Sequence, residues 1–174
     1  MPNKHLNIEI KARCQNHDEI RDFLKSQQAD FKGLDHQIDT YFQVSSGRLK
    51  LREGNIENYL IYYQRENKEG PKQSDVILFK SEPESSLKLI LSQACGILTV
   101  VDKKREIYFI NNVKFHLDTV LNLGTFMEIE AIDSEGNIGK EKLLEQCQQY
   151  LKDLHIAETD LISVSYSDLL LGNK

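Results

Sequence analysis

Charged and apolar residues alternate along several short segments, and this alternation limits the fold more than any other feature of the sequence. In one segment Arg48, Lys50 and Arg52 are separated by Leu49 and Leu51. Successive side chains of a β-strand point to opposite faces of the sheet, so this spacing predicts a strand with one charged and one apolar face. Similar spacing occurs at residues 6–13, 103–105, 113–118 and 127–130. The chain is therefore expected to form an antiparallel β structure.

Strand and helix patterns follow one another along the whole chain. Alternation and turn residues predict strands at residues 6–13, 38–42, 48–52, 59–65, 76–80, 100–110, 113–120 and 125–132. Helical spacing and capping residues predict helices from about residue 16 to before 33, from 83 to about 95 and from 139 to 154, with a short helical turn at 165–171. The polar segment 66–75 has no periodicity, which predicts an exposed, mobile loop. No low-complexity linker separates the two similar halves, so a single domain over residues 1–174 is predicted.

The predicted charged faces differ in sign from the chain as a whole. The chain has a net charge of −5, whereas these faces together carry +5, so the remaining residues must carry −10. The basic members are Lys11, Arg13, Arg48, Lys50, Arg52, Arg65, Lys103, Arg105 and Lys114, and the acidic members are Glu9, Asp118, Glu128 and Glu130. The acidic total excludes a uniformly basic nucleic-acid surface and predicts a concentrated anion site instead.

Two architectures are consistent with strands of this kind. The charged faces can be the solvated outer side of an antiparallel sheet whose other side meets the helices. Alternatively, about eight strands can close into a barrel with the charged faces turned inward, which leaves the apolar faces for the helices. Like charges that share one face of a strand repel one another unless a ligand neutralises them, and this favours an inward face that binds a multiply charged molecule.

A polyphosphate with a divalent metal ion fits such a lumen. Arg and Lys bind phosphate oxygens, while closely spaced carboxylates hold Mg²⁺ or Mn²⁺. Glu128 and Glu130 are two residues apart on one predicted strand and can share an ion, with Glu9 or Asp118 facing them. The alternative is a network of salt bridges to neighbouring basic residues. We interpret His116 as a hydrogen-bonded structural residue, and the sequence contains none of the glycine-rich nucleotide-binding motifs.

The sequence also bears on location. No apolar run approaches the about 20 residues that a membrane-spanning helix needs, and the first residues lack the apolar region of a secretory signal. Cys14, Cys95 and Cys147 are far apart and show neither a disulfide framework nor zinc-ligand spacing. We therefore expect a cytoplasmic protein with reduced thiols that binds neither membrane nor nucleic acid.

Seven segments in order, with the closing residues 165–170, resemble one known family. They are residues 7–11, 39–42, 48–52, 60–65, 101–105, 116–118 and 123–130. The chain resembles the CYTH superfamily, which comprises class IV adenylyl cyclases, thiamine triphosphatases and inorganic triphosphatases. The resemblance covers almost the whole chain and implies an α+β fold, an eight-stranded antiparallel β-barrel that forms a triphosphate tunnel with helices packed on its outside.

The resemblance also implies roles for individual residues. Glu9, Glu128, Glu130 and Asp118 are expected to hold Mg²⁺ or Mn²⁺, and Glu9 and Lys11 are expected to be catalytic. The triphosphate is expected to bind Lys11, Arg48, Lys50, Arg52, Arg65, Lys103, Arg105 and Lys114. The family's first strand reads Glu-x-Glu-x-Lys, whereas this chain has Asn7 in the first position. An amide oxygen can coordinate a metal but brings no charge, so the metal affinity is expected to be reduced.

The function implied by the resemblance is conversion of ATP to cyclic AMP and pyrophosphate, as in the class IV adenylyl cyclases. Hydrolysis of the terminal phosphate of thiamine triphosphate or tripolyphosphate uses the same tunnel and stays open. A module that binds nucleotides or polyphosphate without turnover also stays open, and Asn7 motivates that alternative. In every case the expected partner is a small triphosphate-containing molecule, and a homodimer is one option for the assembly.

Overall fold

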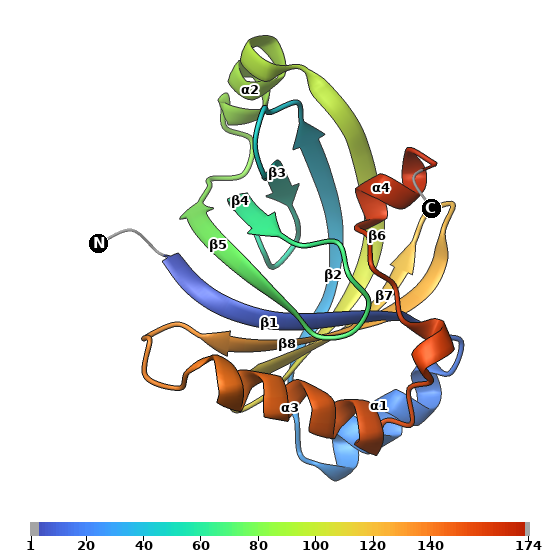
Figure 1. Cartoon of the computed structure of the whole chain (residues 1–174). Coiled ribbons are helices and arrows are strands. Elements are labelled where there is room, and N and C mark those ends of the chain that lie inside the picture. The colour runs from blue at the N-terminus through green and yellow to red at the C-terminus, as the bar shows by residue number, and fades with distance from the viewer. Residues whose placement is uncertain (1–3, 173–174) are drawn as a thin grey trace.

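The computed structural model describes residues 4–172, and its strands close into a barrel with helices on the outside (Figure 1). The strands are β1 (Lys4–Arg13), β2 (Asp30–Phe42), β3 (Arg48–Glu53), β4 (Tyr59–Arg65), β5 (Lys72–Lys80), β6 (Ile97–Ile110), β7 (Val113–Val120) and β8 (Gly124–Asp133). The helices are α1 (His17–Ser26), α2 (Leu87–Cys95), α3 (Lys140–Asp153) and α4 (Tyr166–Leu170), with a 3₁₀ turn at Glu158–Asp160. Around the barrel the order is β1-β5-β4-β3-β2-β6-β7-β8, and every pair is antiparallel. The predicted eight-stranded antiparallel barrel is confirmed.

The main hydrophobic core lies outside the barrel, between its wall and two helices. Helices α1 and α3 cover the outer faces of β1, β7 and β8 (Figure 1). Leu24 of α1 and Leu143 of α3 pack into one cluster with Ile10, Phe115 and Ile129 of these strands, and all five are at most 1% exposed. Burial of each such side chain contributes about 1.5–3 kcal/mol. Because alternate side chains point the other way, this apolar core directs the charged residues of the same strands into the lumen.

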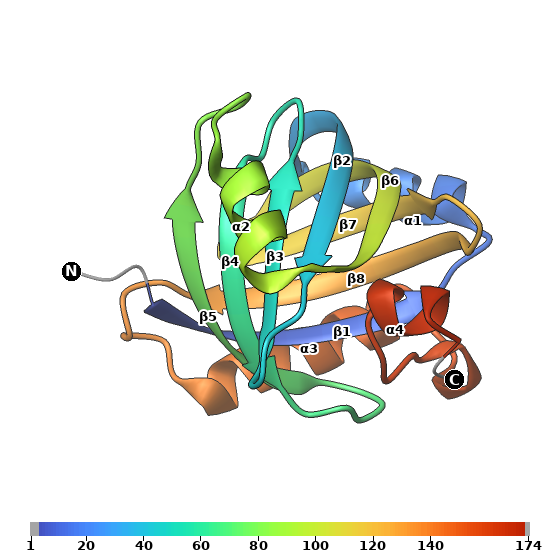
Figure 2. The same cartoon turned by 90° about the horizontal axis from the view of Figure 1, so that it is seen from above.

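The opposite side of the barrel has little cover. Helix α2 lies on the side away from α1 and α3, and none of its side chains is buried (Figures 1 and 2). Leu89 of α2 is 65% exposed, and Phe79 on the outer face of β5 is 61% exposed. The two predicted halves of the chain therefore differ in how their helices pack.

The C-terminal segment packs against the end of β1. The Ile162 amide donates to the Lys11 carbonyl, and Leu161 forms an isolated bridge with Ala12. Helix α4 begins with a capping box between Ser165 and Asp168, and it lies within the helical turn predicted at residues 165–171. The segment that follows β8 is thereby fixed to the end of β1.

Two predicted boundaries were wrong for the same reason. Strand β2 begins at Asp30, not at residue 38, and the helix before it ends at Ser26. Strand β5 begins at Lys72, so the loop after β4 is shorter than predicted, and Lys72 and Ser74 are each only 1% exposed. Both extensions bury polar side chains, with Asp35 and Gln37 fully buried on β2, so their composition resembles that of a loop. No helix in the described part of the chain is long and apolar enough to cross a membrane.

Candidate functional site

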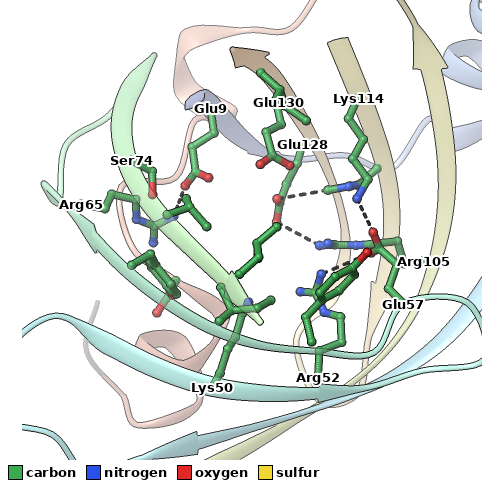
Figure 3. A pocket seen from close by; sticks show the side chains of 18 of the residues that line it. Glu9, Lys50, Arg52, Glu57, Arg65, Ser74, Arg105, Lys114, Glu128 and Glu130 are labelled. Atoms are coloured by element: carbon green, nitrogen blue, oxygen red, sulfur yellow. Dashed lines mark hydrogen bonds and ion pairs between the residues drawn. The ribbon is translucent and has the colours of Figure 1, made fainter. Parts of the chain in front are cut away.

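The charged strand faces point into the barrel and line a cavity of about 290 Å³ (Figure 3). The interpretation as an inward face is therefore correct, and the solvated outer face is excluded. The predicted site residues that line this cavity are Glu9, Lys11, Lys50, Arg52, Arg65, Lys103, Arg105, Lys114, Glu128 and Glu130. Two others, Arg48 and Asp118, lie outside it.

Strand register brings the predicted acidic group together. Glu9 of β1 lies opposite Glu130 of β8, and Lys11 lies opposite Glu128. On the other side of β8, Lys114 pairs with Glu130. Residues that are separated by more than a hundred positions in the sequence thus become neighbours because β1 closes the barrel against β8.

The three lumen carboxylates on β1 and β8 have different partners. Glu9 forms an ion pair with Arg65. Glu128 lies 3.4 Å from the Lys11 ammonium and 3.3 Å from the Arg105 guanidinium. Glu130 instead accepts a hydrogen bond from the Asn7 amide. Two of the carboxylates are therefore neutralised by cations, and the third is held by an uncharged group.

The pKa values reflect this difference in partners. Burial raises the pKa of Glu130 to about 7, and the negative charge of Glu9 acts in the same direction, whereas Lys114 opposes both. Burial also acts to raise the pKa of Glu128, but Lys11 and Arg105 outweigh it and hold that pKa well below its usual value. Of these three carboxylates, Glu130 is thus the one that most readily gains a proton.

These carboxylates fit a divalent metal ion in their donor chemistry. Mg²⁺ and Mn²⁺ prefer carboxylate oxygens, and Glu9, Glu128 and Glu130 present them to the same cavity. Among residues 4–172 no three His, Cys, Asp or Glu side chains lie close enough to hold a metal ion as they stand. A metal site that uses all three carboxylates therefore requires their side chains to move closer together.

Asp118, expected among the metal ligands, lies behind the cavity wall. It is fully buried and accepts two hydrogen bonds from Arg105, at 2.7 and 2.6 Å. The Tyr166 hydroxyl donates a further bond to it at 2.7 Å. Asp118 therefore orients Arg105 toward the lumen, and its oxygens are already occupied.

Asp39 holds a second group of cations in the same way. It is fully buried, it accepts two bonds of 2.9 Å from Arg52, and its Oδ2 lies 2.7 Å from Lys103 and 3.1 Å from Lys50. Burial acts to raise the pKa of Asp39, but these cations outweigh it and hold the pKa well below its usual value. The ladder of like charges on β3 is thus partly neutralised from behind by a carboxylate on the adjacent strand.

Arg48 occupies a different place from the other predicted phosphate ligands. Its guanidinium lies 2.7 Å from Asp168 of α4, and both residues line a neighbouring pocket outside the main cavity. Arg13, also on a predicted charged face, is exposed and lies over the Phe126 ring. Arg13 and Arg48 therefore do not join the other predicted basic residues around the main cavity.

The Tyr166 ring packs directly beneath a predicted catalytic residue. The Lys11 ammonium lies 3.7 Å from the centre of this ring, and Tyr166 is 3% exposed. Burial lowers the pKa of Lys11, and the charge of Glu128 opposes this shift. The closing C-terminal segment thus forms part of the site wall, which the short motif around Ser165 did not reveal.

His116 lines the cavity and is 2% exposed. Its Nδ1 lies 3.4 Å from Glu128, and its Nε2 has no hydrogen-bond partner in the described structure. Burial lowers its pKa to about 4, with a further contribution from Arg105. His116 is therefore neutral near pH 7, and one ring nitrogen remains available.

One end of the cavity is less polar than the rest. Where β1 begins, His5 lies opposite Val76, and Ile61 lies opposite Leu78. With Phe109, these residues line the cavity beside Lys114. The lumen therefore has a charged part and an apolar part.

Several lining residues were not predicted. Besides the apolar residues and His5, they are the tyrosines Tyr41, Tyr59, Tyr63 and Tyr166, the serines Ser74, Ser134 and Ser165, and Glu57. Tyr63 lies two residues before Arg65 on β4 and shares its face, so its strand position could have revealed it. Glu57 lies in the turn between β3 and β4, where no period-two pattern exists.

Comparison with known proteins agrees with this architecture. Residues 5–166 match the model of the CYTH domain. The chain belongs to the CYTH family. Members of this family bind triphosphate-containing substrates such as ATP, and membership implies dependence on a divalent metal ion.

Individual CYTH relatives align along nearly their whole length. A protein of Methanocaldococcus jannaschii named "putative adenylate cyclase" is 27% identical over 173 residues, which cover 94% of this chain and 98% of that protein. A solved structure of a Pyrococcus horikoshii protein is 28% identical, with a TM-score of 0.75, and covers 94% of this chain and 98% of its own. A Hippeastrum protein, 15% identical with a TM-score of 0.65 over 98% of this chain and 96% of its own, shares the fold. Its structure is described as that of an adenylyl cyclase candidate with a dominant triphosphatase activity.

Proposed function

We propose that this CYTH protein is a metal-dependent enzyme that converts ATP to cyclic AMP and pyrophosphate inside the barrel. The observation that carries the proposal is the composition of the lumen, where seven basic side chains and four carboxylates surround one cavity. A polyanion that carries divalent metal needs both kinds of group. The name of the Methanocaldococcus jannaschii relative supports the cyclase reaction.

The basic side chains bind and orient the triphosphate. Arg105 and Arg52 are held from behind by Asp118 and Asp39, so their remaining donors point to the lumen in fixed directions. Lys11 lies between the Tyr166 ring and Glu128. Donors that are already oriented need little reorganisation when charge develops on the phosphates.

The cyclisation forms one bond and breaks another at the same phosphorus atom. The ribose 3′ hydroxyl loses its proton and its oxygen bonds to the α-phosphorus. The bond from that phosphorus to the α–β bridging oxygen breaks, and the released pyrophosphate takes up one proton in exchange. Lys and Arg side chains stabilise the negative charge of the leaving pyrophosphate. Glu9, Glu128 and Glu130 would hold a divalent ion, which would supply positive charge and Lewis acidity at the triphosphate.

The apolar end of the cavity supports an organic triphosphate in preference to bare tripolyphosphate. Ile61, Val76, Leu78, Phe109 and Ile132 line the cavity but offer no side-chain partner for phosphate. Ligand pockets commonly combine apolar walls with a few oriented polar groups. We place the adenosine part of ATP at this end.

Hydrolysis of the terminal phosphate is the second candidate. It is supported by the description of the Hippeastrum protein, which shares the fold. The same basic side chains serve both reactions, so the candidates differ in the attacking oxygen and in the phosphorus that it attacks.

The test is to incubate the purified protein with ATP, thiamine triphosphate or tripolyphosphate in Mg²⁺ or Mn²⁺ and to separate the products. We expect cyclic AMP and pyrophosphate from ATP, with activity lost in Lys11→Met and retained in Lys25→Met, a change on the exposed side of α1. Phosphate release without cyclic AMP would reject the cyclase in favour of hydrolysis. Tight binding by calorimetry without any product would show a binding module.

A further inference from the structure

The lumen contains one carboxylate that the proposed reaction does not use. Glu57 lies in the turn between β3 and β4, and its side chain lines the cavity beside Lys114 (Figure 3). Its Oε2 lies 2.5 Å from the Lys114 ammonium, and its Oε1 lies 3.3 Å from Arg52 Nη1. Burial acts to raise the pKa of Glu57, but Lys114 and Arg52 outweigh it and lower that pKa. Glu57 is therefore an anion at neutral pH that contacts two of the expected phosphate ligands.

The turn that carries Glu57 is fixed in position. The fully buried Asp35 accepts hydrogen bonds from the backbone amides of Ile56 and Glu57, at 2.9 and 3.0 Å. A side chain at Gly54 would come within 2.7 Å of the same Asp35 carboxylate, which explains the glycine. Gln37 donates to both Asp35 and Glu57, at 2.8 and 3.0 Å. Glu57 is thus held in place by hydrogen bonds to its backbone and its side chain, unlike a freely moving surface residue.

Glu57 differs from the buried carboxylates that orient the cations. Asp39 takes the Nε and Nη2 groups of Arg52 from behind the wall, which leaves Nη1 directed to Glu57. Lys114 has no other carboxylate within ion-pair distance among the described residues. Glu57 therefore occupies the donors of Arg52 and Lys114 that a phosphate would use.

We propose that Glu57 is an internal anion that competes with the substrate's phosphates for Lys114 and Arg52. The inference rests on the proposed triphosphate site and adds a residue that limits its affinity. A carboxylate in this position neutralises the two cations in the ligand-free protein and weakens the binding of both triphosphate and pyrophosphate. Weaker binding of the product favours its release, and release limits turnover in many enzymes.

The test uses calorimetry to compare tripolyphosphate binding in the wild-type protein and in two variants that each lose one carboxylate charge. Glu57→Gln keeps the shape of the side chain and removes its charge, and we expect at least tenfold tighter binding. Glu53→Gln is the matched control, because Glu53 is four residues away and pairs with Lys88 at 2.9 Å without lining the cavity. We expect less than a twofold change for this control. Glu57→Asp, which keeps the charge but shortens the reach, should bind with intermediate affinity.

The possible outcomes separate this inference from the proposed function. Unchanged or weaker binding in Glu57→Gln would overturn the competition, and so would equal tightening in both variants, which would indicate only the change in net charge. Should Glu57→Gln fail to fold, Glu57→Asp carries the test, and no tightening in that variant overturns the inference. Absence of tripolyphosphate binding in the wild type would reject the triphosphate site itself.

Discussion

The two faces of strand β7 show how this protein separates stability from function. On the outer face Val113, Phe115 and Leu117 are at most 2% exposed and pack in the core with α1 and α3. On the inner face Lys114 and His116 line the cavity, and Asp118 orients a lumen arginine. Burial of the apolar outer face stabilises the fold. The inner face holds charged side chains away from bulk water, which costs free energy. Substitutions on the two faces should therefore have different consequences, although the residues alternate along one strand.

The largest effect on stability is expected in the outer core. Phe115 is fully buried and packs edge-on against Tyr150 of α3. Phe115→Ala should lower the free energy of unfolding by about 3–5 kcal/mol, since it removes this packing and leaves a cavity. Denaturant unfolding checks the value, with Leu121→Ala, at a residue 60% exposed, as a control of small effect. A loss below about 1 kcal/mol would show that the outer core is not the main source of stability.

On the lumen side, Glu130 should make stability depend on pH. Its pKa is raised from 4.5 to about 7 by burial, so the folded protein holds this proton more tightly than the unfolded chain. Relative to Glu130→Gln, the wild type should therefore lose stability as pH rises from about 4.5 to 7, on the order of 3 kcal/mol in total. Unfolding curves recorded with a chelator at several pH values measure the difference. Parallel stability profiles for the two proteins would refute the raised pKa.

A smaller effect is expected at Asn7, which donates to Glu130 and whose Oδ1 has no partner in the described structure. Asn7→Glu restores the charge that the family's first strand carries, so Mn²⁺ should bind about tenfold more tightly, because affinity for a hard cation increases with ligand charge. Titration of Mn²⁺ into both proteins measures this. Equal or weaker affinity for Mn²⁺ in the variant would contradict the explanation that a missing charge weakens metal binding.

The alternation of residues predicted the strands and most of the charged residues that line the cavity, because a period of two fixes which side chains share a face. Lys103, Arg105, Lys114, Glu128 and Glu130 all line the cavity in the expected phase. The resemblance to the CYTH superfamily predicted the closure of the barrel, which alternation alone left open.

The remaining site features depend on contacts that the spacing of residues does not encode. Asp118 has the expected phase, but the sequence does not show that Arg105 and Tyr166 occupy its oxygens. Glu57 belongs to a turn, and its position is set by hydrogen bonds to Asp35, which comes from another strand. Long-range partners of this kind appear only once the chain has folded.

The central claim is that the inner face binds the triphosphate, and neighbouring lysines on β6 test it most directly. Lys103 lines the cavity and is 2% exposed, whereas the adjacent Lys104 is exposed on the outside of the barrel. Each residue can be replaced by Met with the same loss of charge, and Asp39 keeps Arg52 and Lys50 as partners in Lys103→Met. Calorimetric titration with tripolyphosphate and Mn²⁺ should show at least tenfold weaker binding for Lys103→Met and less than a twofold change for Lys104→Met. Equal effects of the two substitutions, or none from Lys103→Met, would contradict a triphosphate site in the lumen.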